Sequence, residues 1–313
     1  MTASRRVLVW LVHGSYMNAL VQGPHEYLLP LAPGGGADGS GRLGYPWPPA
    51  AREVAAAALR HEAIDVVIVQ RPRDLELCEA WTGRRPGRDL PVIWLEHNAP
   101  QGRIRDMRHP AAELRGALLV HVCHFNDLFW DAGSIRTRVI EHGIVDPGYR
   151  YTGELPRAVA VVNEARRRGR VTGTDLLPRF RASAPVDLLG IDSEALGGVG
   201  DIPYERLHDV MARRRVYLHP IRWTSLGLSL LEAMHAGMPV VAVAATEVPD
   251  AVPPAAGIVS TDVERLARAV RHLIDEPDEA RERGLAARRA ALARYGLHRF
   301  LRDWDAAIEE AIA

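Results

Sequence analysis

Short apolar runs alternate with stretches of helical periodicity along most of the chain. Several runs show no alternation of apolar and polar positions, which is typical of strands buried on both faces of a parallel sheet. Strands are predicted over residues 7–12, 64–70, 92–97, 118–123, 138–141, 158–162, 186–191, 216–219, 240–244 and 257–259. Helices are predicted over residues 51–60, 204–214, 228–236, 262–274, 277–295 and 297–311. This order predicts an α/β protein whose parallel sheets are connected by right-handed crossovers.

A segment without periodicity, residues 143–156, divides the pattern into two parts. It is rich in Gly and Pro, which is typical of a linker. We therefore predict two doubly wound, Rossmann-like domains with a cleft between them, over residues 1–146 and 157–296.

Residues 33–49 are also rich in Gly and Pro, but lack the Gly-Lys-Ser/Thr ending of a phosphate loop. We interpret them as a mobile surface loop.

The composition narrows the function classes. Lys plus Arg and Asp plus Glu both number 39, and a neutral chain is a poor binder of nucleic acid or anionic membranes. No lysine is present, which excludes Schiff-base lysine chemistry. The two cysteines, Cys78 and Cys123, are too few for a disulfide scaffold or a Cys-rich zinc site. No apolar run approaches the ~18 residues of a membrane span, so we expect a cytoplasmic monomer or homodimer without stable membrane insertion.

The most informative segment follows the predicted strand 216–219. A short loop leads into a helix that begins after Gly227, and a residue without Cβ lets backbone amides approach a ligand closely. The free N–H groups and the dipole of a helix start form an anion site suited to a diphosphate. Glu232 lies further along, between apolar neighbours, and its carboxylate can accept hydrogen bonds from the vicinal hydroxyls of a ribose. The alternative for Glu232 is a solvated carboxylate on the helix surface.

This segment resembles the donor site of retaining GT-B glycosyltransferases of the family 4 kind, the glycosyl transferases group 1. The residues that carry the resemblance are His219, Pro220, Gly227, Leu230, Leu231, Glu232, Ala233, Met234, Ala236, Gly237, Pro239, Val240, Val241, Pro249, Asp250 and Gly257. The resemblance implies the GT-B fold, in which the second domain binds a nucleotide-diphosphate sugar and the first binds the acceptor. It also implies that the terminal helix, residues 297–313, packs back on the N-terminal domain.

The resemblance assigns roles within this segment. Glu232 would bind the ribose of the donor nucleotide. The transferred sugar and the diphosphate would be held by the loop residues Thr224, Ser225, Leu226 and Gly227. The family usually has Glu where this chain has Thr224, so an altered donor sugar and a loss of activity both stay open. A second departure is the pair Thr246-Glu247, where a Gly-Gly pair is common in the family. Glu247 either supplies a carboxylate to the site or is an exposed loop residue.

A run of arginines follows the predicted strand 158–162. In the family, a separated pair of cationic residues clamps the diphosphate at this place, and Arg can do so with two hydrogen bonds. The resemblance therefore points to Asn163, Arg168 and Arg170 as donor-binding residues, the arginines offsetting charge on the leaving group. The alternative for the run is a solvated charged surface.

Two candidates lie in the first domain. His97 ends the predicted strand 92–97, at the carboxyl edge where open α/β sheets bind ligands. The family often has a His there, so His97 is predicted to be catalytic, by hydrogen bonding to the sugar or acceptor or by proton relay; the alternative is a structural His. Gly14 follows the first strand, where the family has a loop that faces the donor. No metal site is predicted, because the spacing of His121 and His124 puts them on opposite faces of a strand.

These features predict a retaining glycosyltransferase that moves a sugar from a nucleotide-diphosphate sugar to a hydroxyl of an unidentified acceptor. The nucleotide sugar is a co-substrate, and no metal or other cofactor is required if the arginines and the helix start offset the leaving charge. Two alternatives stay open: a GT-B sugar-nucleotide epimerase or hydrolase, and a non-catalytic nucleotide-sugar-binding protein.

Overall fold

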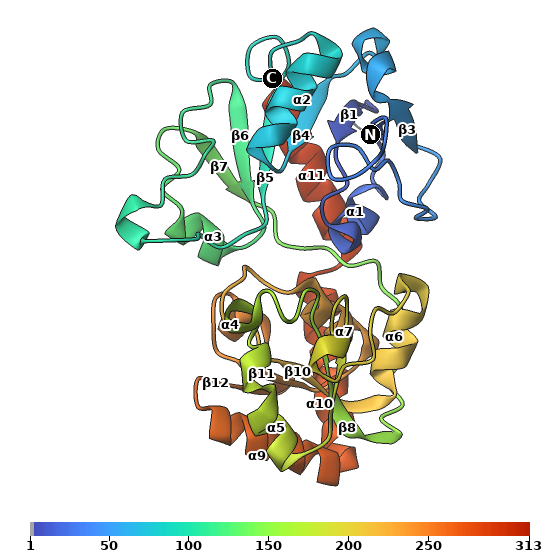
Figure 1. The fold of residues 1–313 in the computed structure, drawn as a ribbon, viewed down its shortest axis with the longest axis vertical. Coiled ribbons are helices and arrows are strands. Elements are labelled where there is room, and N and C mark those ends of the chain that lie inside the picture. Colours follow the sequence, from blue (N-terminus) through green and yellow to red (C-terminus); the bar gives the residue numbers. More distant parts are fainter. Residues whose placement is uncertain (1–2) are drawn as a thin grey trace. The chain divides into compact units, whose positions relative to one another are not determined.

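The computed structural model describes residues 3–313, which divide into two compact units. Unit 1 consists of the chain up to Val145 together with Leu297–Ala313, and unit 2 consists of Asp146–Gly296. Each unit is built around one parallel β-sheet with helices on its faces (Figure 1). Residues 145–154, around the boundary between the units, form neither helix nor strand.

The sheet of unit 1 has seven parallel strands in the order β3-β2-β1-β4-β5-β6-β7. The strands are β1 (Arg6–Val9), β2 (Glu26–Leu31), β3 (Ala51–Ala55), β4 (Val66–Val69), β5 (Val92–Glu96), β6 (Ala117–His121) and β7 (Arg136–Val139). β4, β5 and β6 are buried along their whole length, as apolar runs without alternation predict. The strand order reverses between β1 and β4, and doubly wound sheets bind ligands outside the carboxyl ends of the strands at such a point.

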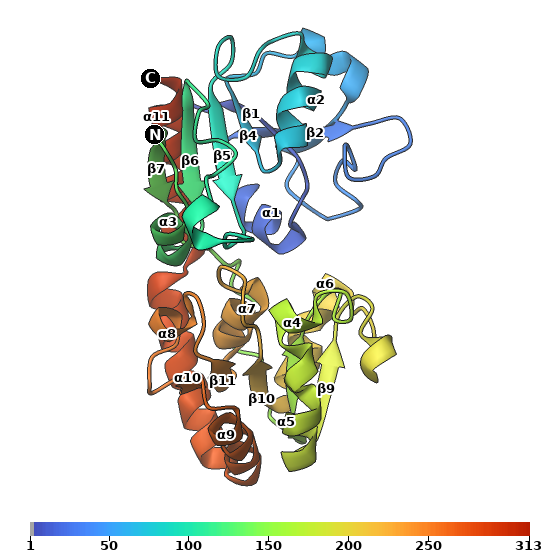
Figure 2. The ribbon, with the colours of Figure 1, turned by 60° about the vertical axis from the view of Figure 1, so that its left-hand side comes forward.

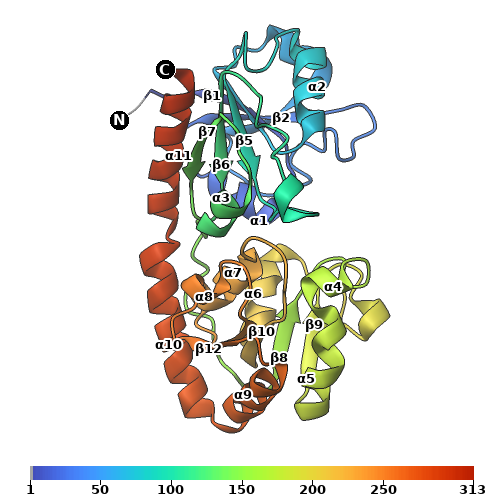
Figure 3. The ribbon, with the colours of Figure 1, turned by 90° about the vertical axis from the view of Figure 1, so that its left-hand side faces the viewer.

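Helices cover both faces of this sheet. They are α1 (Gly14–Leu20), α2 (Pro72–Thr82), α3 (His124–Phe129) and α11 (Leu297–Ile312), with the short 3-10 helices η1 (Ala56–His61) and η2 (Ile104–Asp106). α2 and α11 lie on opposite sides of the sheet (Figure 2). α11 packs on β4, β5 and β6, so the last helix of the chain belongs to unit 1 (Figure 3).

Tyr16 connects α1 to α11. The indole N–H of Trp304 donates to the Tyr16 hydroxyl at 3.0 Å, and both side chains are only 1% exposed. The ring of Phe300 packs edge-on against Tyr16, with 5.3 Å between the ring centroids. At Gly143 a Cβ would lie 2.3 Å from the Phe300 Cβ, so the absence of a side chain there lets the helix approach closely.

Unit 2 has five parallel strands in the order β12-β11-β10-β8-β9. The strands are β8 (Leu155–Val161), β9 (Val186–Leu189), β10 (Arg214–His219), β11 (Val240–Val243) and β12 (Gly257–Ser260). The helices are α4 (Gly169–Thr172), η3 (Thr174–Leu176), α5 (Leu177–Ser183), η4 (Glu194–Leu196), α6 (Tyr204–Ala212), α7 (Leu228–Ala236), α8 (Val248–Ala251), α9 (Val263–Asp275) and α10 (Pro277–Arg294). α5 and α9 share one core with the sheet, while α6 and α10 pack with α7. Across residues 3–313, no helix has the length and apolar character needed to cross a membrane.

Every predicted strand is present, but the predicted helix over residues 51–60 is wrong. This segment forms β3 followed by η1. Its alanines favour a helix in isolation, whereas the pairing of β3 with β2, from Tyr27–Ala51 to Leu31–Ala55, overrides that preference. β2 has no counterpart among the predicted strands, because Pro30 interrupts its apolar pattern.

The segment of residues 33–49 is bound to the rest of unit 1 at several points. Trp10 donates its indole N–H to the Asp38 carbonyl at 2.9 Å, and the backbone N–H of Arg42 donates to a Glu53 carboxylate oxygen at 2.7 Å. Trp47 is only 4% exposed. The segment is therefore a surface loop that is anchored at Asp38, Arg42 and Trp47, while Leu43 between these anchors is 69% exposed.

Tyr16→Phe should lower the free energy of unfolding by about 1–3 kcal/mol, because the substitution leaves the buried Trp304 N–H without its acceptor. Tyr149→Phe is the matched control: its side chain is 42% exposed, and we expect a change below about 0.5 kcal/mol. Urea denaturation followed by circular dichroism measures both values. Equal effects of the two substitutions would contradict the role given to the Tyr16 hydroxyl.

Candidate functional site

Two segments that carry predicted donor-binding residues follow neighbouring strands of unit 2. β8 and β10 pair in parallel, so the segments after Val161 and after His219 leave the sheet at the same edge. The order of the strands reverses at this pair. Ligands of doubly wound sheets bind at such a reversal, outside the carboxyl ends of the strands.

The two segments touch each other. Gly173 follows α4 with φ +73°, and a Cβ at this residue would lie 1.8 Å from the carbonyl oxygen of Pro220. The backbone N–H of Arg222 donates to the Val171 carbonyl at 2.9 Å. The fold therefore brings the arginine run and the loop 220–227 to one place.

The two arginines predicted to form the clamp differ in their partners. Arg170 is 83% exposed and lies 3.5 Å from Asp175, which also accepts from Arg222 at 2.5 Å. Arg168 is half-buried at the start of α4 and has no ion-pair partner within 4 Å among residues 3–313. Arg170 is thus paired with a carboxylate of unit 2, whereas the charge of Arg168 is not.

Asn163 holds the ends of two strands together. Its side-chain oxygen accepts from the backbone N–H of Ile191 at 3.1 Å, which joins the loop after β8 to the loop after β9. At Gly190, with φ +121°, a Cβ would lie 2.9 Å from the same oxygen. The structure thus gives the oxygen of Asn163 a partner in the chain, a role that differs from the predicted donor contact.

The loop predicted to hold the sugar and diphosphate leads into α7. Ser225 and Leu226 are each 4% exposed, and Thr224 is half-buried. At Gly227 a Cβ would lie 2.6 Å from Cε1 of His219, so this glycine makes room for the imidazole as well as for a ligand. The residue before α7 supplies no side-chain cap, so the N–H groups of the first turn are suited to an anion.

Two carboxylates in this part of unit 2 are buried. Glu232, on α7, and Glu247, before α8, are each 2% exposed, so the solvent-exposed alternatives are wrong for both. The backbone N–H of Glu247 donates to the Ser225 carbonyl at 3.4 Å, and its carboxylate accepts from Arg294 at 3.3 Å. Glu247 therefore links the end of α10 to the predicted donor loop, a contact that the sequence pattern does not reveal.

His97 lies at the carboxyl edge of the sheet of unit 1, directly after β5. It is 9% exposed, and the centroid of its ring lies 4.2 Å from that of His13 and 4.7 Å from that of Tyr16. Its Nε2 is hydrogen-bonded to the side-chain oxygen of Gln70 at 2.9 Å. Burial, reinforced by His13 and His142, lowers the pKa of His97 well below 6.5. Sequence reasoning missed Gln70, although a polar residue directly after a buried strand is the signal that identified His97.

Gly14 begins α1, after the loop that follows β1. A Cβ at Gly14 would lie 2.3 Å from the Tyr45 hydroxyl oxygen. Tyr45 in turn stacks on Trp47, with 4.9 Å between the ring centroids. Within unit 1, Gly14 therefore provides the space against which this part of segment 33–49 rests.

The other histidines of this edge have different surroundings. His121, at the end of β6, is buried, which lowers its pKa to about 4, and its Nε2 lies 3.7 Å from an Asp127 oxygen. His109 is hydrogen-bonded through Nε2 to the Glu96 carboxylate at 3.0 Å. His124 is exposed on α3. In the part of the chain that the structure describes, no three His, Cys, Asp or Glu side chains are grouped to hold a metal ion.

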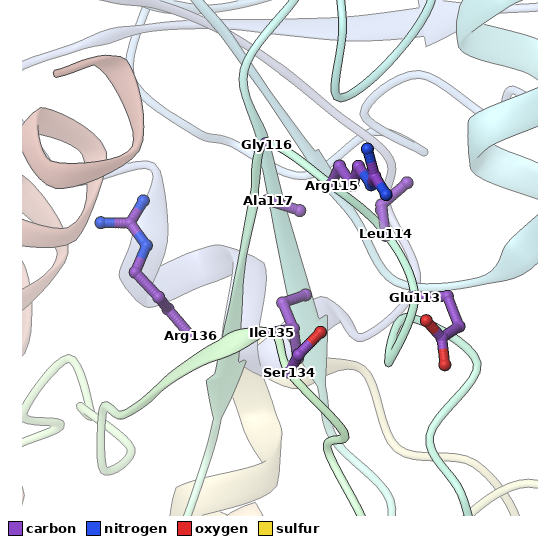
Figure 4. Close-up of a pocket in the computed structure, with 8 residues that line it drawn as sticks. All are labelled: Glu113, Leu114, Arg115, Gly116, Ala117, Ser134, Ile135 and Arg136. Carbon is purple, nitrogen blue, oxygen red and sulfur yellow. The ribbon is translucent and has the colours of Figure 1, made fainter.

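A pocket of about 320 Å³ lies at the opposite edge of the sheet of unit 1 (Figure 4). It is formed at the amino ends of β6 and β7 and includes Glu113, Arg115 and Arg136. Arg136 is already paired with Glu310 of α11 at 3.4 Å. Because ligands of doubly wound sheets bind at the carboxyl edge, we do not assign the reaction to this pocket.

A comparison with known families finds a match within the second unit. Residues 194–290 match the sequence profile of the family described as Glycosyl transferases group 1, less than half of the chain. This part of unit 2 therefore resembles the group 1 glycosyltransferases. The matched range contains the loop 224–227, Glu232 and Glu247, and the arginine run precedes it.

A curated relative also resembles part of the chain. Over 185 residues, the chain is 28% identical to an MMP alpha-(1->4)-mannosyltransferase of Mycolicibacterium hassiacum. This stretch covers 58% of the chain and 45% of the relative. The chain thus spans less than half the length of that mannosyltransferase, and the resemblance concerns a part of each protein.

Solved structures resemble the chain over nearly its whole length. A sucrose-phosphate synthase from Thermosynechococcus elongatus has a TM-score of 0.73 at 16% identity and covers 98% of each chain. Anabaena HepE, solved in complex with UDP, has a TM-score of 0.72 at 14% identity and covers 98% of this chain and 100% of its own. These likenesses, together with a parallel sheet in each of the two units, show the GT-B fold.

Gly173→Ala should destabilise unit 2 more than Gly148→Ala. Both glycines have positive φ, +73° and +81°, so each alanine meets a backbone penalty of roughly 1–2 kcal/mol. Only at Gly173 would the new Cβ collide with a carbonyl oxygen, whereas nothing lies within 4 Å of a Cβ at Gly148. We expect an extra loss of about 1–3 kcal/mol in urea denaturation. Equal losses would show that the contact with Pro220 does not hold the two segments together.

His219→Gln should weaken the dependence of stability on pH. His219 is 1% exposed, and burial lowers its pKa from 6.5 to about 4. Between these pH values the unfolded chain binds a proton that the folded chain does not, so stability falls as the pH drops below 6.5. The substitution should remove about 2 kcal/mol of the stability lost between pH 8 and pH 5, as measured by urea denaturation. An unchanged loss would contradict a buried neutral imidazole.

Proposed function

We propose that the chain is a glycosyltransferase that moves a sugar from a nucleotide-diphosphate sugar to an acceptor hydroxyl, with retention of the anomeric configuration. One observation carries the proposal: the arginine run and the loop that leads into α7 touch each other at the carboxyl edge of the sheet of unit 2. The groups suited to a diphosphate and a ribose belong to these segments and to α7; they are Arg168 and Arg170, the first turn of α7, and the buried carboxylate of Glu232. The match to the group 1 profile supports this assignment, and HepE, solved with UDP, makes UDP the first nucleotide to test.

Each group has a defined task in this proposal. The N–H groups at the start of α7 donate to the diphosphate, and the helix dipole favours its negative charge. Arg168 and Arg170 add permanent positive charges that can each bind two phosphate oxygens. Glu232 accepts hydrogen bonds from the two ribose hydroxyls. These hydrogen bonds offset the free-energy cost of burying its carboxylate in unit 2.

The reaction takes place on one face of the sugar. The bond between the anomeric carbon and the phosphate oxygen breaks while the acceptor oxygen forms its bond to the same carbon. The acceptor proton passes to the departing phosphate oxygen, so charge and atoms balance without a separate base. The arginines and the start of α7 stabilise the negative charge that develops on the diphosphate, a role that makes a metal ion unnecessary. Unit 1 binds the acceptor in this proposal, and His97 hydrogen-bonds a sugar or acceptor hydroxyl.

Thr224 influences which donor sugar is bound. Its hydroxyl can donate one hydrogen bond, whereas the carboxylate usual in the family accepts from several hydroxyls. We therefore expect a sugar that presents fewer hydroxyls, or hydroxyls placed differently, to the loop before Ser225. Thr224 is half-buried, so its hydroxyl is partly shielded from water and its choice of partner matters for binding.

Glu232→Ala should weaken nucleotide binding at least about tenfold, equivalent to about 1.4 kcal/mol. The substitution removes the carboxylate proposed to hold the ribose and leaves the phosphate-binding groups in place. Isothermal titration calorimetry with UDP, GDP and dTDP measures the loss and identifies the base. Glu282→Ala, an exposed position on α10, is the matched control and should bind as the unaltered chain does.

The possible outcomes separate the steps of the proposal. Failure to bind any of the three nucleotides, or full binding by Glu232→Ala, would rule out the donor site. Mass spectrometry of the products detects transfer. Nucleotide binding without transfer to any acceptor would favour a nucleotide-sugar-binding protein. Release of free sugar would instead favour a hydrolase, and the anomeric configuration of a transferred sugar, read by NMR, tests retention.

A further inference from the structure

The side chain of Gln70 lies between a backbone carbonyl and the imidazole of His97. Its Nε2 donates to the Trp10 carbonyl at 2.8 Å, and its Oε1 lies 2.9 Å from Nε2 of His97. A carbonyl oxygen only accepts hydrogen bonds, so the side-chain nitrogen of Gln70 must face Trp10 and its oxygen must face His97. This oxygen also only accepts, so Nε2 of His97 must carry a hydrogen.

We infer that Gln70 is a positioning residue that holds His97 as the tautomer with its hydrogen on Nε2. In the neutral ring, Nδ1 then has no hydrogen and can only accept. The hydrogen bond made by one ring nitrogen commonly decides the state of the other, and such supporting contacts orient a functional histidine. Nothing in the sequence pattern distinguishes this tautomer from the opposite one.

Gln70 can impose this state because it is itself held in place. It follows β4, is 9% exposed, and its backbone N–H donates to an Asp74 carboxylate oxygen at 2.9 Å. Asp74 is fully buried in the first turn of α2, and its other oxygen accepts from Arg71 at 2.6 Å. Asp74 therefore anchors the backbone of Gln70, and the Trp10 carbonyl fixes its side-chain amide, so turning the amide over would break a hydrogen bond.

The surroundings of His97 favour the neutral ring. The groups that face it are His13 and Tyr16, in ring contact, with His142 close enough to act on its charge. Burial raises the pKa of the Tyr16 hydroxyl, which therefore brings no negative charge. Burial penalises a charge on His97, and His13 and His142 lower its pKa further.

The consequence for the reaction rests on the proposed function. A neutral His97 with its Nε2 hydrogen directed to Gln70 accepts a hydrogen bond at Nδ1 and does not deliver a proton. It therefore orients a hydroxyl or N–H group that donates to it, while protonation of the departing diphosphate is left to the acceptor hydroxyl. This assigns His97 the orienting task and excludes the task of general acid.

Long-range ¹⁵N–¹H NMR of the full chain, labelled at histidine, tests the inference without any substrate. The spectrum of His97, assigned by its loss in His97→Gln, should show a protonated Nε2 and an unprotonated Nδ1 at pH 7. A hydrogen on Nδ1, or an imidazolium, would overturn the inference whether or not the chain transfers sugars. Absence of transfer with the expected spectrum would count against the proposed function alone.

Two substitutions of Gln70 separate its acceptor oxygen from its shape. Gln70→Leu removes the acceptor, and the spectrum of His97 should change to a mixture of both tautomers. Gln70→Glu restores an acceptor with a negative charge, so Nε2 should keep its hydrogen while the pKa of His97 rises by at least about one unit. Retention of the Nε2 tautomer by Gln70→Leu would overturn the positioning role.

Gln22→Leu is the matched control. Gln22 also donates its side-chain nitrogen to a backbone carbonyl, that of Asn18 at 3.1 Å, but it makes no hydrogen bond to a histidine. The spectrum of His97 should be unchanged in this variant. If Gln70→Leu does not fold, the spectra of the unaltered chain and of Gln70→Glu still decide the tautomer.

Discussion

The strands of each sheet all run in one direction, and this constraint places the chemistry of both units. A parallel strand must return through a crossover before the next one starts, so all carboxyl ends gather at one edge. In unit 2 this puts the arginine run and the loop 220–227 side by side, where the bare backbone of Gly173 rests on Pro220. In unit 1 the same rule puts Gln70 and His97 within hydrogen-bonding distance, although they follow different strands, β4 and β5.

The arrangement of the fold follows from the apolar pattern where strands are buried on both faces. β4, β5, β10 and β11 were predictable because each is a compact apolar run, and α7 was predictable to the residue because Gly227 and Gly237 flank it. β2 and β3 were not predictable. β3 is read as a helix because alanine favours helix locally, and only its pairing with β2, far away in sequence, decides otherwise.

The candidate site was predictable as a set of segments but not as a set of contacts. A strand end locates His97 and apolar neighbours single out Glu232, whereas Thr224 is indicated only by the resemblance to the family. Burial of Glu247 depends on Arg294 at the end of α10, which approaches it only after α10 has packed on α7. The tautomer of His97 likewise depends on the orientation of one amide, which is fixed by Trp10 from another strand. Such contacts arise from packing, and a linear pattern does not encode them.

Because the chain has no lysine, only arginines can supply permanent side-chain charges to a phosphate. Which arginine is able to bind one depends on how tightly the neighbouring carboxylates hold its guanidinium. Asp175 holds Arg222 by two contacts, of 2.5 and 3.1 Å, and Arg222 also donates to the backbone of Arg170, so Arg222 is committed to the loop. Arg170 is mostly exposed and its contact with Asp175 is longer, so it loses little by leaving. A diphosphate carries more negative charge than one carboxylate and can draw Arg170 away from Asp175. In the proposed donor site, the clamp would combine Arg168, whose charge is not held by a carboxylate of the described residues, with Arg170, which would exchange a carboxylate for a phosphate.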